Sequence, residues 1–355
     1  MTKDRVRVLV VDDSALMRKL IPQMLAGDDS IEVVGTAMDG NFCLKKIEEL
    51  KPRVVTLDLE MPGMNGIDTL KEIMRKHPLP VIVFSSHSTE GATVTMKALG
   101  LGAFDFVTKP KDPSAHMAET ARELIAKIRA AAECRVKPRV FAAIPPKPEK
   151  ASVSAAYPSK VIAIGVSTGG PQALEYLLGQ LPGNFPATIL VVQHMPDGFT
   201  EMFAKRLDEL SALRVKEAQS GDLLQPGRVL ICPGSRHMKV KRLPLADVVV
   251  LSDDPHVNGH RPSADVLLRS VAEEFKTHTI GVLMTGMGDD GAEGMGAVKK
   301  EGGMTLAQNE ESCVVYGMPR AAIERGYVIR VVGLEVLGAT LQALCGKTTA
   351  VRAGN

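Results

Sequence analysis

The feature that most constrains the fold is an alternation of short apolar runs with segments of helical period, repeated in two blocks along the 355 residues. The strand-like runs are residues 6–11, 32–37, 53–59, 80–85 and 103–108 in the first block, and 161–165, 187–193, 228–232, 247–251, 279–284, 304–307 and 327–331 in the second. Such alternation is typical of parallel sheets covered by helices. We therefore predict an α/β fold: a doubly wound parallel sheet in the first block and a mostly parallel sheet in the second, with some antiparallel pairing around residues 228–251.

A proline-rich segment separates the two blocks. Five prolines fall within residues 134–158, where they exclude helix interiors and sheet ladders. We predict a first domain over residues 1–132, with a last helix over about 113–133, a linker over 133–159, a second domain over 160–347 and a tail over 348–355.

Composition excludes several classes of protein. Lys and Arg number 43 against 41 Asp and Glu, so the near-neutral charge argues against a nucleic-acid partner. The five scattered cysteines form no C-x-x-C pair, which argues against a disulfide framework or a zinc cluster and favours a reducing compartment. Neither a signal peptide nor a run of about 18 to 20 apolar residues is present. We expect a cytoplasmic protein without membrane insertion.

Polar residues follow the predicted strands of the first block, at the edge where doubly wound sheets bind ligands. The first strand leads into Asp12 and Asp13, the third into Asp58, the fourth ends at Ser85 and the fifth leads to Lys109. Any one of these aspartates alone would more often be a helix cap or a turn residue. Converging carboxylates repel one another unless a cation lies among them, and oxygen ligands suit Mg²⁺. The combination predicts a Mg²⁺ site at which the lysine contacts a phosphoryl oxygen.

The first block resembles a response-regulator receiver domain over about residues 5–130. The motifs that carry the resemblance are Val10-Val-Asp-Asp-Ser14, Leu57-Asp-Leu-Glu-Met-Pro-Gly-Met-Asn-Gly66 and Phe106-Val-Thr-Lys-Pro110. The resemblance implies a flavodoxin-like fold in which Asp58 accepts a phosphoryl group from a histidine kinase. It also implies that Asp12, Asp13 and Asp58 bind Mg²⁺, that Lys109 contacts the phosphoryl oxygens, and that the Ser85 hydroxyl follows the phosphoryl group.

A serine in the second block lies on a sharp predicted strand-to-helix turn. The apolar run 161–165 leads into Gly165-Val-Ser-Thr-Gly169, and Pro171 suits the first turn of a helix. The G-x-S-x-G spacing can expose a nucleophilic hydroxyl beside helix amides. A glycine-rich phosphate-binding turn fits this stretch equally well.

A serine nucleophile needs a base, and an imidazole base needs a third group that fixes its tautomer. His194, at the end of the run 187–193, is the best candidate base, although alone it would more often be structural. Two strand ends compete to supply the carboxylate, Asp253-Asp254 and Asp289-Asp290. The glycine-rich segment 285–291 favours the second pair, but spacing does not choose between its members. The resulting Ser, His, Asp order differs from that of α/β-hydrolases.

Six motifs of the second block occur together in sequence: Ile164-Gly-Val-Ser-Thr-Gly-Gly-Pro171, Val192-Gln-His-Met-Pro196, Cys232-Pro-Gly-Ser-Arg-His-Met238, Arg261-Pro-Ser-Ala-Asp265, Leu283-Met-Thr-Gly-Met-Gly-Asp-Asp-Gly-Ala292 and Cys313-Val-Val-Tyr-Gly-Met-Pro319. With them, the block resembles the catalytic domain of the chemotaxis protein-glutamate methylesterases. The resemblance implies Ser167 as nucleophile, His194 as general base and Asp290 as orienting carboxylate. Met287 would supply an oxyanion amide, and Thr168 would line the site.

Four further positions in or beside these motifs have no assigned role: Asp289, where the family often has Asn, and Arg236, His237 and Arg261.

The two resemblances together imply a phosphorylation-activated esterase. It would hydrolyse glutamate γ-methyl esters on methyl-accepting chemoreceptors, release methanol, deamidate receptor glutamines and need no cofactor for the esterase. The unphosphorylated receiver would inhibit it, and a histidine kinase of the chemotaxis pathway would be the phosphoryl donor. A DNA-binding response regulator would instead carry a small basic output domain, and a nucleotide-binding module would carry a G-x-x-x-x-G-K-[ST] loop. Neither is present.

Overall fold

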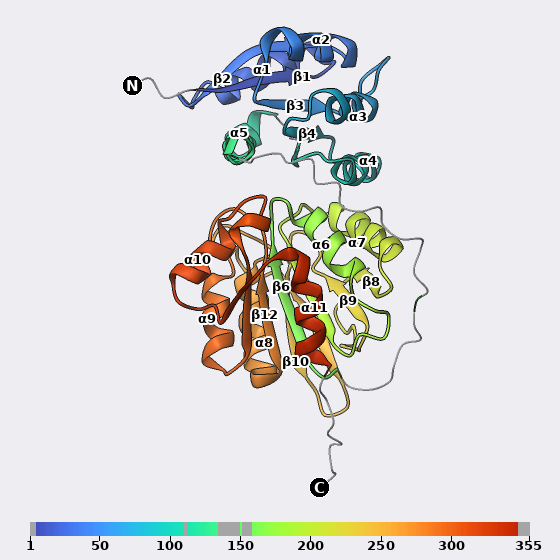
Figure 1. The fold of residues 1–355 in the computed structure, drawn as a ribbon, viewed down its shortest axis with the longest axis vertical. Coiled ribbons are helices and arrows are strands. Elements are labelled where there is room, and N and C mark those ends of the chain that lie inside the picture. Colours follow the sequence, from blue (N-terminus) through green and yellow to red (C-terminus); the bar gives the residue numbers. More distant parts are fainter. Residues whose placement is uncertain (1–4, 110–112, 134–149, 151–157, 347–355) are drawn as a thin grey trace. The chain divides into compact units, whose positions relative to one another are not determined.

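A computed structural model describes residues 5–109, 113–133, 150 and 158–346. The chain forms two compact units, Met1–Val140 and Phe141–Asn355, which are described separately (Figure 1). Most of the predicted linker 133–159 and the whole predicted tail 348–355 lie outside the described residues, so their limits stay predictions. No helix in the described ranges is both long and apolar enough to cross a membrane.

The first unit is a five-stranded parallel sheet with the strand order β2-β1-β3-β4-β5, which is the flavodoxin-like order predicted from the receiver resemblance. Its strands are β1 (Val6–Val11), β2 (Ile31–Ala37), β3 (Val54–Asp58), β4 (Val81–Ser85) and β5 (Asp105–Thr108). Its helices are α1 (Ala15–Leu25), α2 (Gly40–Leu50), α3 (Gly66–Lys76), α4 (Thr89–Gly100) and α5 (Pro113–Glu133). The last helix matches the predicted span.

Polar caps begin four of these helices and so fix where each strand-end loop stops. Ser14, Asp39, Asn65 and Ser88 each accept a hydrogen bond from a backbone N–H in the first turn of α1, α2, α3 and α4. The strands themselves are apolar, and every residue of β3 and β4 is buried. Asp12 and Asp13, directly after β1, and Asp58, the last residue of β3, therefore lie at one edge of the sheet.

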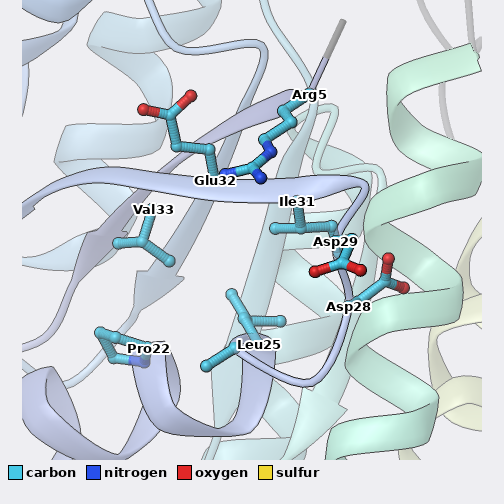
Figure 2. A pocket seen from close by; sticks show the side chains of 9 residues that line it. Arg5, Pro22, Leu25, Asp28, Asp29, Ile31, Glu32 and Val33 are labelled. Carbon is cyan, nitrogen blue, oxygen red and sulfur yellow. The ribbon is translucent and has the colours of Figure 1, made fainter. Parts of the chain in front are cut away.

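A pocket of the first unit lies between the end of α1 and the start of β2 (Figure 2). Pro22 and Leu25 line one side, and Ile31 and Val33 line the other. Because Ile31 begins β2, this pocket lies at the amino ends of the strands. Asp12 and Asp58 lie at the carboxyl ends, so the pocket is separate from them.

The second unit contains a seven-stranded sheet in the order β14-β13-β12-β6-β7-β9-β8, with every neighbouring pair parallel. The strands are β6 (Val161–Val166), β7 (Thr188–Gln193), β8 (Arg214–Glu217), β9 (Arg228–Ile231), β12 (Thr279–Leu283), β13 (Met304–Gln308) and β14 (Arg330–Val332). The helices are α6 (Gly170–Gly179), α7 (Phe199–Leu210), α8 (Ala264–Phe275), α9 (Ala292–Lys300), α10 (Met318–Glu324) and α11 (Leu334–Cys345).

The antiparallel pairing expected near residues 228–251 is present, but only in part of that range. Strands β10 (His237–Arg242) and β11 (Asp247–Ser252) form a separate two-stranded antiparallel sheet, whereas β9 joins the parallel sheet. Sequence patterns missed β10 because Lys and Arg alternate with its apolar residues, and missed β8 because only Val215 of its four residues is buried. The predicted strand 327–331 begins later, at Arg330, because the Tyr327 N–H donates to the Ala322 carbonyl of α10.

The core of the second unit fills both faces of its sheet. Val161 and Ala163 of β6 belong to a cluster that includes Leu268 and Val271 of α8, whereas Ile162 and Ile164 are buried and point the opposite way. A parallel sheet requires this two-sided burial. It leaves the strand ends as the place where polar side chains can meet.

Candidate active site

The first unit brings its three predicted carboxylates together. One oxygen each from Asp12, Asp13 and Asp58 lies within 4.8 Å of the others, with Asp12 and Asp58 buried and Asp13 exposed. Lys109 Nζ donates to Asp58 Oδ2 at 2.6 Å and lies 3.2 Å from Asp12 Oδ2. Burial raises the pKa of both Asp12 and Asp58, and the Lys109 ammonium opposes that rise.

These residues fit a bound Mg²⁺ ion. Asp12 Oδ2 is buried and makes no hydrogen bond among the described residues, although Lys109 is close to it. All three candidate ligands are carboxylate oxygens, the donor type that Mg²⁺ prefers. Asp12, Asp13 and Asp58 would hold the ion, which when bound neutralises charge on an incoming phosphoryl group.

The structure does not direct the Ser85 hydroxyl toward Asp58. Ser85 Oγ accepts a hydrogen bond from Thr95 Oγ1 at 2.6 Å and lies 3.3 Å from the Gly91 carbonyl, so it is bonded to α4. The backbone of Lys109 lies beside the end of β4, because the Lys109 N–H donates to the Ser85 carbonyl at 2.7 Å. Asp58 and Lys109 therefore meet directly, whereas the Ser85 hydroxyl contacts α4 instead.

In the second unit, Ser167 follows β6 on a tight turn. Its N–H donates to the Thr285 carbonyl at 3.0 Å, and its carbonyl accepts from the Gly170 N–H at 2.8 Å. Gly169 has φ of +77°, which favours glycine, and a Cβ there would lie 2.5 Å from Val314 Cβ. Helix α6 begins at once, with Pro171 in its first turn. The predicted strand-turn-helix geometry is present.

His194 follows β7, the strand next to β6, and contacts a carboxylate from a distant loop. Its Nε2 lies 2.8 Å from Asp290 Oδ2. Asp290 also accepts from Ser263 Oγ at 2.7 Å and from the Ala264 N–H at 2.7 Å. Burial alone would raise the pKa of Asp290, but the hydrogen bonds from His194, Ser263 and Ala264 lower it to about 2. This carboxylate is therefore ionised at neutral pH.

The competing carboxylates point elsewhere. Asp289 accepts from Arg325 Nη2 at 2.6 Å at the surface. Asp253 pairs with Arg236 at 2.9 and 2.8 Å, and Asp254 pairs with Lys239 at 2.6 Å. The geometry thus singles out Asp290 as the contact of His194.

His194 presents Nδ1 as its remaining polar atom. Nδ1 is buried and has no hydrogen-bond partner among the described residues. Because the ionised Asp290 only accepts, Nε2 carries the proton in this contact and Nδ1 carries the lone pair. No hydrogen bond of the Ser167 hydroxyl is found within the described ranges, and such bonds are often long before substrate binds.

The loop after β12 touches the serine turn. A Cβ on Gly286 would lie 2.9 Å from Ser167 Cβ and 3.1 Å from Ser167 N, so only glycine permits this approach. The next residue, Met287, is 37% exposed, and within the described residues its backbone N–H has no partner. Thr168 is buried, and its carbonyl accepts from Thr285 Oγ1 at 2.9 Å. Met287 can therefore offer an amide beside Ser167.

Sequence patterns missed several residues that support this site. Ser263 lies in the motif Arg261-Pro-Ser-Ala-Asp265 and bonds Asp290 directly. His260 stacks on His194 with ring centroids 4.0 Å apart and 8° between the planes. Burial, and then the neighbouring His194, lower the pKa of His260 to about 4. His260 follows Gly259 and directly precedes the motif that begins at Arg261. It belongs to no helical or strand periodicity, so no sequence pattern could have identified it.

Arg236, His237 and Arg261, which have no assigned role in the sequence, make contacts that hold a loop in place. His237 is buried, lies 3.0 Å from the Pro255 carbonyl through Nε2, and accepts from the Ser263 N–H through Nδ1. Arg261 donates to the Asp253 and Asp254 carbonyls. Together with the Arg236–Asp253 pair, these contacts fix the loop that presents Ser263.

Comparison with known proteins matches both units. A family model described as CheB methylesterase matches residues 162–341, and one described as a response regulator receiver domain matches residues 8–121. A Koribacter versatilis protein named protein-glutamate methylesterase/protein-glutamine glutaminase 2 is 60% identical over 94% of each chain. A Halalkalibacterium halodurans protein named protein-glutamate methylesterase/protein-glutamine glutaminase is 45% identical over 97% of this chain and 99% of its own. The crystal structure of the Thermotoga maritima CheB methylesterase catalytic domain is 44% identical, with a TM-score of 0.52 over 52% of this chain and 98% of that one.

Proposed function

Because this chain belongs to the CheB methylesterase family and carries a response regulator receiver domain, we propose that Ser167, His194 and Asp290 catalyse its reaction. The activity is hydrolysis of glutamate methyl esters and deamidation of glutamine side chains in chemotaxis, under control of the receiver. Methyl-accepting chemoreceptors are the proposed substrates, and a histidine kinase is the proposed phosphoryl donor.

In the proposed mechanism, the Ser167 hydroxyl attacks the carbonyl carbon of a glutamate γ-methyl ester. His194 accepts the serine proton at Nδ1 and returns it to the departing methoxide, so methanol leaves and an acyl-enzyme remains. His194 then takes a proton from the water that attacks the acyl-enzyme and passes it to Ser167 Oγ as the acyl bond breaks, so glutamate leaves and the serine hydroxyl and neutral imidazole are restored. With a glutamine substrate the leaving group is ammonia, and the remaining steps are the same.

Asp290 and the backbone around Ser167 would lower the barrier. The ionised Asp290 holds the Nε2 proton of His194 and stabilises the imidazolium that forms during each transfer. The Met287 N–H, and Thr168 on the same side, would face the oxyanion of the tetrahedral intermediate. Loss of one such donor costs about 3 kcal/mol in well-studied hydrolases.

The observation that carries the proposal is the 2.8 Å contact between His194 and Asp290, since His194 follows β7 and Ser167 follows its parallel neighbour β6. Its test is Ser167→Ala, assayed by methanol release from methylated receptor in membranes. We expect a loss of up to about a millionfold, the scale seen when a serine nucleophile is removed. An unchanged thermal unfolding temperature of the second unit, which contains Ser167, would show that it remains folded, and substantial residual turnover would remove Ser167 from this role.

A second test separates an esterase from a phosphate-binding module. A phosphonofluoridate reagent should modify Ser167 covalently, and the modified peptide can be identified by mass spectrometry. His194→Ala should slow this labelling, because the base no longer accepts the serine proton. Absence of labelling in the phosphorylated chain would favour a phosphate-binding module.

The receiver is proposed to transfer a phosphoryl group from the kinase to Asp58. Mg²⁺ held by Asp12, Asp13 and Asp58, together with Lys109, would neutralise the added charge. The Ser85 hydroxyl would leave its present contact with α4 to reach the phosphoryl group.

A further inference from the structure

One buried side chain bonds both the proposed nucleophile and the proposed base. Gln193, the last residue of β7, is 2% exposed. Its Nε2 donates to the Ser167 carbonyl at 3.0 Å and to the His194 carbonyl at 3.2 Å. A single carboxamide therefore connects the residue after β6 with the residue after β7.

This link occurs where the backbone ladder between the two strands stops. The register of β6 and β7 ends at Val166 opposite Gln193, and the last ladder bond runs from the His194 N–H to the Val166 carbonyl at 3.1 Å. Ser167 then turns toward α6, and its N–H bonds Thr285 on the other side. Beyond this point within the described residues, the Gln193 carboxamide supplies the hydrogen bond that joins the two chain segments.

The turn is shaped to admit the carboxamide. A Cβ on Gly170 would lie 2.1 Å from Gln193 Oε1, so an alanine at this position would collide with the glutamine. Gly169 and Gly170 thus have different reasons to be glycine: the first adopts a positive φ, and the second leaves room for Gln193.

Stability alone does not explain a glutamine here. Gln193 Oε1 is buried and has no hydrogen-bond partner among the described residues. Burying an amide oxygen without a partner is destabilising, and an apolar side chain of similar length would avoid that cost. Only a donor, however, can bond the two carbonyls.

We infer that Gln193 is a positioning residue, which fixes the distance between Ser167 and His194 through their carbonyl groups. The inference rests on the proposed catalytic roles of those two residues. Because Gln193 is buried, it does not touch the substrate, and its loss should leave substrate binding unchanged. Proton transfer from Ser167 to His194 should become slower, since small misplacements of reacting groups reduce rates strongly.

The test compares Gln193→Met and Gln193→Asn with the unaltered full-length, phosphorylated chain. Met keeps the length but donates no hydrogen bond, and Asn keeps the amide but is one carbon too short to reach both carbonyls. We expect kcat for methanol release to fall by about 10- to 100-fold with KM unchanged. Labelling of Ser167 by the phosphonofluoridate should slow by a similar factor.

Thr188→Val is the matched control. Thr188 is a fully buried polar residue at the other end of β7, where its hydroxyl donates to the Gln225 carbonyl at 2.7 Å. The Thr188→Val variant should have lower thermal stability and an unchanged kcat. If both Gln193 variants kept full kcat, or lost no more of it than Thr188→Val, the inference would be overturned while the proposed function stood. Activity of Ser167→Ala would overturn the proposed function instead.

Discussion

Asp290 contacts His194 at Nε2, at a distance of 2.8 Å, and not at Nδ1. In serine hydrolases of the chymotrypsin type the carboxylate holds Nδ1, and Nε2 faces the serine. In the proposed mechanism the two ring nitrogens of His194 exchange these roles, so the proton of Ser167 would pass to Nδ1. The buried Nδ1 atom without a partner is consistent with that direction.

The first prediction separates the two neighbouring aspartates. Asp290→Asn should reduce kcat for methanol release by about ten-thousandfold, the effect of the same change in a related triad, because the amide no longer fixes the tautomer of His194. Asp289→Asn is the matched control, since Asp289 pairs with Arg325 at the surface and should leave kcat unchanged. Equal losses in the two variants would show that the contact with His194 has no special importance.

The second prediction concerns pH and His260. Its pKa is lowered to about 4 in the folded chain, from 6.5. Between pH 6.5 and about 4, His260 is therefore protonated in the unfolded state but neutral in the folded state. The free energy of unfolding should decrease as pH falls through this range. At about 1.4 kcal/mol per pH unit, the loss is at most about 3 kcal/mol.

His260→Phe should retain the ring stack and remove this part of the pH dependence. The measurement is denaturant unfolding followed by circular dichroism, because the chain has no tryptophan. Asp290 does not contribute in this window: its lowered pKa of about 2 stabilises the fold above pH 4, and that contribution is lost only as pH falls from about 4 to 2. A His260→Phe chain with the same pH dependence as the original would contradict the assignment.

The third prediction concerns the receiver. Asp58→Asn should abolish acid-labile phosphate uptake from acetyl phosphate, because the nucleophilic carboxylate is lost. Asp68→Asn, on the exposed surface of α3, is the control and should be phosphorylated normally.

The fourth prediction tests the metal ligands without phosphorylation. Mg²⁺ at about 100 times its Kd should stabilise the receiver by about 2.7 kcal/mol. Asp13→Asn, which removes an exposed ligand and leaves the buried pair intact, should shift the midpoint of this stabilisation to higher Mg²⁺ concentration. The readout is the thermal unfolding temperature over a Mg²⁺ titration, and an unchanged midpoint would exclude Asp13 as a ligand.

The fifth prediction addresses control of the esterase. If the unphosphorylated receiver inhibits the esterase, a chain that begins near Lys160 and lacks the receiver should release methanol faster than the full-length, unphosphorylated chain. Phosphorylation of the full-length chain should raise its rate in the same direction. If the shortened chain were folded and no faster, the receiver would not act as an inhibitor.

Much of the fold was predictable because burial leaves a periodic trace in the sequence. Strands such as β6 and β7, buried at every position, are uninterrupted apolar runs and were located closely. β8 and β10 were missed because they are short or half-exposed, so charged residues interrupt their apolar pattern. The assigned roles of the site residues, and the domain limits, stay predictions.

By itself the sequence determined two parallel βα sheets and the identity of the polar residues at their strand ends, since both are local properties of the chain. Residue patterns did not choose between Asp289 and Asp290, and only the family resemblance implied Asp290. The tertiary structure decided which of them contacts His194, and through which ring nitrogen, across 96 residues of sequence. The strand order β12-β6-β7 made that choice, because it places the serine turn between the loop that carries Asp290 and the strand that ends before His194. Contacts of Gln193 and Ser263 follow from the same order, and no local pattern encodes them.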